Sequence, residues 1–111
     1  MRIALHSVIV DGSIDQYRAR HARIPDDLRV LFAEAGIHDW TIWRSGRNLF
    51  HVVDCADFDR AMSVVESAPA NAAWQKDIGR FVEGFYGPDG EVGFLPIERV
   101  WSLEEQNLTA P

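Results

Sequence analysis

The fold is decided by residues 37–54, which read IHDWTIWRSGRNLFHVVD. Aromatic and β-branched residues fill both ends of this stretch, and in the first run Trp40 and Ile42 share one side. Between the two runs, Ser45-Gly46-Arg47 is a tight-turn signal. The stretch therefore predicts a β-hairpin whose strands cover residues 37–44 and 48–54.

The residues before the hairpin predict one strand and a helical segment in two pieces. Residues 2–10 are rich in Ile, Leu and Val and stop at Asp11-Gly12, which indicates a strand. Ser13, followed three residues later by Gln16, has the pattern of a capping box and predicts that a helix starts there. Pro25 interrupts that helix and can open a second piece over 25–35, which Gly36 ends.

The residues after the hairpin predict a second helical segment divided by a proline. Phe58, Met62 and Val65 are spaced as one face of a helix, which Pro69 closes, and a further helix is predicted over 71–82. Beyond it we expect a glycine-rich loop over 84–93 and a last strand over 94–101. Residues 1–103 then form a single domain, and residues 104–111 form a polar C-terminal tail.

The predicted order is β-α-β-β-α-β, that of a ferredoxin-like α+β fold with helices on one face of an antiparallel sheet. The other face would remain bare, and large exposed apolar patches are rare in monomers. Self-association of two sheets covers such a face, so we expect a homodimer in the form of a dimeric α+β barrel. Trp43 and Trp101 are assigned to the core or to the dimer interface.

Composition excludes several classes of function. The chain has 111 residues and a net charge of −6, which argues against binding to nucleic acid or to an anionic membrane surface. No apolar run reaches the roughly 20 residues of a membrane-spanning helix, and the N-terminus lacks the pattern of a signal peptide. Cys55 is the only cysteine, so no internal disulfide forms and a cytoplasmic location is expected.

Tyr17 and His21 are the residues with the clearest chemical potential. They stand four residues apart in the first predicted helix, and residues at this spacing lie on one helix face. A phenol next to an imidazole that titrates near neutrality can hold a hydroxylated ligand and transfer a proton to it. The other interpretation is that both are ordinary side chains on a helix surface.

Taken in order along the chain, these features resemble the L-rhamnose mutarotase family, from Arg2 to about Leu103. The resemblance is carried by Tyr17-x-x-x-His21, by Ile24-Pro25-Asp26-Asp27-Leu28 around the proline that opens the next helix, and by the segment from Ala35 to Trp43. It continues through the hairpin residues Arg47 to Phe50, Trp74, and the terminal strand from Pro96 to Trp101.

The resemblance implies a small dimeric enzyme that interconverts the α and β anomers of an L-sugar without metal or cofactor. It implies that His21 is the proton donor and that Tyr17, Trp40 and Trp74 bind the substrate. Ala73 stands where the family has the first tryptophan of a tandem pair, which removes a wall of the pocket and makes L-fucose a rival substrate to L-rhamnose.

Other interpretations stay open. Trp40 and Trp74 fit plain packing as well as they fit a pocket wall. His6, His38 and His51 match no zinc spacing, so we predict strand histidines with satisfied hydrogen bonds. The same scaffold could instead carry a monooxygenase or decyclase acting on an aromatic molecule, or a ligand-binding module without catalysis.

Overall fold

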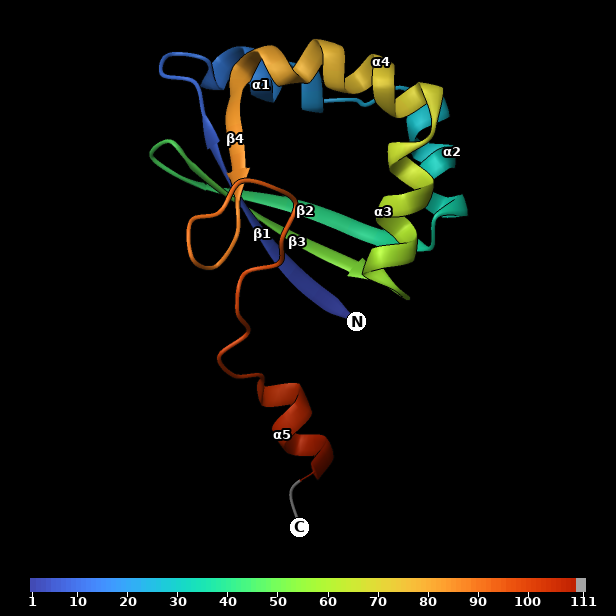
Figure 1. Ribbon diagram of the computed structural model, residues 1–111, viewed down its shortest axis with the longest axis vertical. Coiled ribbons are helices and arrows are strands. Elements are labelled where there is room, and N and C mark those ends of the chain that lie inside the picture. Colours follow the sequence, from blue (N-terminus) through green and yellow to red (C-terminus); the bar gives the residue numbers. More distant parts are fainter. Residues whose placement is uncertain (110–111) are drawn as a thin grey trace.

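The computed structural model describes residues 1–109 and arranges four strands in one antiparallel sheet, in the order β2-β3-β1-β4 (Figure 1). The strands are β1 (Arg2–Ile9), β2 (Ile37–Ser45), β3 (Asn48–Cys55) and β4 (Val82–Tyr86). Two helices follow β1 and two follow β3, so the predicted ferredoxin-like α+β class is confirmed.

The predicted hairpin is formed by β2 and β3. Ser45 pairs with Asn48, so only Gly46 and Arg47 form the turn between the strands. Gly46 has a φ of 59°, in the left-handed region that favours glycine. The pairing of Trp40 with Val53 places both side chains on the face of the sheet that the helices cover.

The helices lie on one face of this sheet (Figure 1). They are α1 (Ile14–His21), α2 (Asp26–Glu34), α3 (Phe58–Glu66) and α4 (Pro69–Ile78), and the 3₁₀ helix η1 (Gly79–Phe81) continues from α4. Both predicted proline breaks are present, because Pro25 precedes α2 and Pro69 opens α4. The core between the layers includes Leu5, Val53 and Phe58.

The predicted capping box at the start of α1 is wrong. The helix does begin directly after Ser13, but the Ser13 side chain makes no capping hydrogen bond. Ser13 has φ −101° and ψ 3°, whereas a capping side chain usually requires an extended backbone at this position. Asp57 has that backbone, and its Oδ1 accepts from the Arg60 N–H at 3.1 Å, capping α3.

The fourth strand lies earlier in the chain than predicted. The predicted helix over 71–82 ends sooner, and β4 occupies part of the expected glycine-rich loop. Pairing with β1 decides this, because Ser7 lies opposite Phe85 and His6 opposite Tyr86. The predicted strand over 94–101 is wrong, because this segment forms no strand. It contains Pro96, which has no N–H to donate to a neighbouring strand. The segment contacts the sheet through a hydrogen bond from the Ile97 N–H to the Ala4 carbonyl oxygen.

The predicted polar tail contains a further helix, α5 (Leu103–Thr109). Beyond Ile97 the chain runs away from the sheet and leads into this helix, which has no buried residue (Figure 1). The last two residues of the predicted tail lie outside the described residues. In residues 1–109, no helix combines the length and the apolar character needed to cross a membrane.

Candidate functional site

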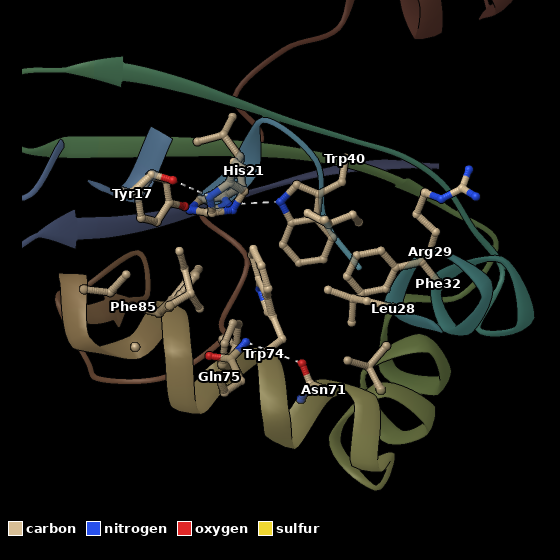
Figure 2. Close-up of a pocket in the computed structure, with 18 of the residues that line it drawn as sticks. Tyr17, His21, Leu28, Arg29, Phe32, Trp40, Asn71, Trp74, Gln75 and Phe85 are labelled. Carbon is tan, nitrogen blue, oxygen red and sulfur yellow. Dashed lines mark hydrogen bonds between the residues drawn. The ribbon is translucent and has the colours of Figure 1, made fainter. Parts of the chain in front are cut away.

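A cavity of about 740 Å³ lies between the sheet and the helices that cover it (Figure 2). Its lining includes all four of the predicted site residues, which come from three different elements. Tyr17 and His21 come from α1, Trp40 from β2 and Trp74 from α4. Residues that are far apart in the sequence therefore meet around one space.

Tyr17 and His21 lie against each other on α1, with their ring centroids 4.2 Å apart. His21 Nδ1 lies 3.0 Å from the backbone carbonyl oxygen of Tyr17. A carbonyl oxygen can only accept, so the proton of the neutral imidazole is on Nδ1. This hydrogen bond leaves Nε2 with its lone pair available to accept a proton.

Burial keeps both side chains in their neutral forms near neutral pH. It lowers the pKa of His21, an effect that the hydrogen bond to the Tyr17 backbone partly offsets. Burial also raises the pKa of the Tyr17 phenol far above its ordinary value. His21 is therefore ready to act as a base, and Tyr17 is a hydrogen-bond donor that does not ionise.

Trp74 forms part of the apolar surroundings of His21. The two rings meet nearly at right angles, with centroids 5.1 Å apart. Arg20 on α1 forms an ion pair with Asp77 on α4 at 3.1 Å, which ties the helices of His21 and Trp74 together. Ala73 is exposed and lies outside the cavity lining, so the structure shows no pocket wall at this position.

Trp40 forms a flat apolar wall on the sheet side of the cavity. Its ring stacks on Phe32 of α2, with centroids 5.8 Å apart and an angle of 18° between the planes. The Trp40 indole N–H donates to His51 Nδ1 at 3.0 Å, so the polar group of this wall is bonded to the protein itself (Figure 2).

The cavity lining also includes residues that sequence reasoning did not place there, among them His51, Phe85 and Phe94. The prediction that His51 is a strand histidine with satisfied hydrogen bonds is confirmed, because both ring nitrogens are bonded. Strand alternation contained the missing signal. His51 is a polar residue in the inward-facing row between Leu49 and Val53.

The other two histidines of this group lie away from the cavity lining. His6 bonds Asn48 Oδ1 at 2.9 Å, as predicted for a satisfied strand histidine, whereas His38 is exposed at a bulge in β2. Within residues 1–109, no group of three or more His, Cys, Asp or Glu side chains is arranged to hold a metal ion.

The cavity is mainly apolar, with a few polar groups that reach it from the helices. Asn71 and Gln75 lie on α4 next to Trp74, and Arg29 lies at the α2 end (Figure 2). An apolar space with a small number of placed polar groups is typical of a small-molecule site. Its aromatic walls suit a ligand with a flat apolar face, and His21 can exchange a proton with it.

Comparison with known protein families gives one result for nearly the whole chain. A family model for L-rhamnose mutarotases matches residues 2–103. A comparison with curated protein sequences finds no match.

Solved structures with similar folds come from several kinds of enzyme. An L-rhamnose mutarotase from Formosa agariphila superposes with a TM-score of 0.73 at 17% identity, covering 93% of this chain and 98% of that one. Tetracenomycin F2 cyclase from Streptomyces glaucescens has a TM-score of 0.68 at 19% identity, covering 100% and 99%. A putative antibiotic biosynthesis monooxygenase from Bordetella bronchiseptica has a TM-score of 0.60 at 22% identity, covering 74% and 84%. At these identities the likenesses show a shared fold.

Proposed function

The chain belongs to the L-rhamnose mutarotase family, and from this premise we propose that it interconverts the α and β anomers of a 6-deoxy-L-hexose. L-rhamnose is the first candidate substrate and L-fucose is its rival. The observation that carries the proposal is the position of His21 in the lining of an apolar cavity, with its Nδ1 bonded to the Tyr17 carbonyl oxygen. Burial there lowers its pKa and favours the neutral imidazole.

Mutarotation requires only one proton to be moved, so a single imidazole is sufficient. His21 Nε2 takes the proton of the C1 hydroxyl, the electron pair of that O–H bond forms the aldehyde C=O, and the bond from C1 to the ring oxygen breaks. The imidazolium then gives its proton to the former ring oxygen. Rotation about the bond between C1 and C2, followed by the reverse steps, closes the ring as the other anomer.

The remaining predicted site residues hold the sugar in this proposal. The Tyr17 phenol stays protonated and donates a hydrogen bond to a sugar oxygen. Trp40 and Trp74 pack against the apolar C–H face of the ring and its C6 methyl group. No metal or cofactor takes part in the proposed steps.

Saturation-transfer NMR tests the activity directly on L-rhamnose and L-fucose, with unrelated aldoses for comparison. We expect the protein to accelerate anomer exchange of a 6-deoxy-L-hexose. The substitution His21→Gln should lower the catalysed rate by about a hundredfold or more. His38→Gln is the matched control, because His38 is exposed and lies outside the cavity lining. Acceleration of no sugar, or an unchanged rate in His21→Gln, would overturn the proposal.

A second candidate is catalysis on a flat aromatic molecule, as in a small monooxygenase or decyclase. The observation in its favour is the size of the apolar cavity, about 740 Å³, which lies in the range of sites for drug-sized ligands. The stacked rings of Phe32 and Trp40 also offer a flat surface. Oxygen uptake in the presence of a naphthohydroquinone, without any effect on sugars, would support this candidate.

A third possibility is a binding module, which would bind sugar saturably without accelerating exchange. Calorimetric titration with L-rhamnose beside the NMR assay separates it from the enzyme.

We also propose that the protein is located in the cytoplasm. The thiol of Cys55 is buried and forms no disulfide, which fits a reducing compartment.

We also propose that the protein works as a homodimer, with a second copy covering the outer sheet face. Trp43 pairs with Phe50 on that face, and their exposed fractions are 64% and 38%. In the segment after β4, Val100 and Trp101 are also 90% and 65% exposed. Large apolar side chains exposed side by side on an uncovered sheet face, as Trp43 and Phe50 are, are typical of an association surface.

A further inference from the structure

Three neighbouring strands contribute to a chain of two hydrogen bonds, one buried and one half-buried, at the sheet side of the cavity. Ser7 on β1 lies 2.8 Å from His51 Nε2 on β3, and the indole nitrogen of Trp40 on β2 lies 3.0 Å from His51 Nδ1. Ser7 is fully buried and His51 is 2% exposed. The dashed line at the Trp40 indole nitrogen in Figure 2 marks the second of these bonds.

The direction of both hydrogen bonds follows from the chemistry of the indole. An indole N–H can only donate, so His51 Nδ1 accepts and carries no proton. The proton of the neutral ring is then on Nε2 and is donated to the Ser7 hydroxyl oxygen. His51 thus has the opposite tautomer to His21, whose Nδ1 carries the proton.

His51 remains neutral in this position. Burial, together with repulsion from positive charge on His21 and His6, lowers its pKa to about 4. The ring is buried and neutral, and each of its nitrogens makes a hydrogen bond. These bonds hold the ring in one orientation, so the Nδ1 lone pair stays directed at Trp40.

This arrangement affects Trp40, because the only polar group of its side chain, the indole N–H, is hydrogen-bonded to His51. Phe32 supports the indole by stacking on it, and His51 meets it nearly at right angles, with an angle of 85° between the planes. Trp40 therefore offers the ligand carbon surface and no hydrogen-bond donor.

We propose that His51 is a positioning residue that sets the Trp40 indole as an apolar wall of the substrate pocket, and that Ser7 anchors His51 from the opposite side. The proposal rests on the proposed role of Trp40 in binding the sugar. It assigns His51 no contact with the reacting atoms, so the loss of His51 should impair binding and leave the chemical step nearly unchanged.

The test uses His51→Phe, which keeps a flat ring and removes both hydrogen bonds. The double variant Ser7→Ala, His51→Phe also removes the hydroxyl that would be left buried without a partner, so folding is protected. His38→Phe is the matched control, because it makes the same substitution at an exposed strand histidine.

The first measurement is the indole N–H signal of Trp40 in ¹H–¹⁵N NMR spectra, assigned with a Trp40→Phe variant. We expect a hydrogen-bonded, slowly exchanging signal in the native protein and in His38→Phe. In the His51 variants the indole N–H signal should shift, and its proton should exchange quickly with water. This measurement needs no substrate, so it stands even if the mutarotase proposal fails.

The second measurement is the kinetics of L-rhamnose anomer exchange. We expect KM to rise about tenfold in the His51 variants, the effect of losing the hydrogen bond that holds Trp40, with kcat nearly unchanged. An unchanged indole signal would overturn the positioning role. A fall in kcat at constant KM would also overturn it, because His51 would then act on the reaction itself.

Discussion

His21 and His51 show how one residue type acquires two different states in the same cavity. The Nδ1 atom of His21 donates to a backbone carbonyl, whereas the Nδ1 atom of His51 accepts from an indole. Burial lowers the pKa of both rings and keeps them neutral. The difference in tautomer gives His21 a lone pair for proton transfer and directs that of His51 to Trp40.

The pH dependence of anomer exchange follows from the lowered pKa of His21. The proposed base is the neutral ring, and its pKa lies below the ordinary value of 6.5. We therefore expect a constant catalysed rate at pH values well above 6.5 and a loss of rate as the pH falls through the His21 pKa, with its midpoint below pH 6.5. Exchange NMR across this range, with the uncatalysed rate subtracted at each pH, checks the expectation. A loss of rate centred above pH 6.5 would contradict it.

The stability of the protein should depend on His51 in acid. Its pKa is about 4 in the folded protein against 6.5 for the unfolded chain, so between these values the unfolded state binds more protons. The stabilisation is complete above pH 6.5 and is lost progressively as the pH falls from 6.5 to 4, where the loss has reached about 3 kcal/mol. Urea unfolding of the native protein and of His51→Phe isolates this contribution from that of the carboxylates. Equal pH slopes in the two proteins would show that His51 contributes nothing.

At the scale of elements, a tight turn and a contact between two helices hold the site in place. The two-residue turn between β2 and β3 sets the register that brings His51 next to Trp40. Likewise, the ion pair between Arg20 and Asp77 joins α1 to α4 and holds His21 near Trp74. Because the two residues of that pair are about two-fifths exposed, its contribution to stability is small, and packing between the helices dominates.

The turn of the hairpin offers a test with a built-in control. Gly46 has a φ of 59°, so Gly46→Ala forces a side chain into the left-handed region and should lower the free energy of unfolding by about 1 kcal/mol. Gly79 has a φ of −61° and no atom within 4 Å of an added Cβ, so Gly79→Ala should be neutral or slightly stabilising. Urea unfolding curves compare the two. Equal losses would show that backbone conformation at the turn is unimportant.

At the scale of the whole molecule, one sheet face is covered by helices and the other is open. The covered face holds the cavity, and the open face has Trp43 and Phe50 exposed. The segment that ends in α5 extends beyond the sheet instead of folding back on it (Figure 1). Both features support the proposed association with a second copy.

Association predicts that thermal stability depends on protein concentration. We expect sedimentation to give twice the chain mass of 12.6 kDa and the Tm to rise with concentration, because dissociation accompanies unfolding. Trp43→Ser should abolish both effects, whereas Arg44→Ser, which changes the exposed neighbour in the same strand, should preserve them. A single-chain mass at every concentration would disprove the dimer.

The candidate site was predictable where it depends on neighbours in sequence. Tyr17 and His21 contact each other because four residues of helix bring them to one face. Trp40 and Trp74 were placed by the family resemblance, and the structure brings both to the same cavity. His51 was predicted to be satisfied, but its partners come from strands whose pairing the sequence does not state.

The sequence by itself determined the hairpin, the helix breaks at Pro25 and Pro69 and the helical pair at the site, because each depends on the backbone preferences of adjacent residues. Only the tertiary structure decided that β4 begins at Val82 and that residues 94–101 form no strand. It likewise decided the hydrogen bonds of His51, whose partners Ser7 and Trp40 lie 44 and 11 positions away from it along the chain. The physical reason is that strand pairing satisfies backbone and buried polar groups across the sheet, where distance along the chain carries no information.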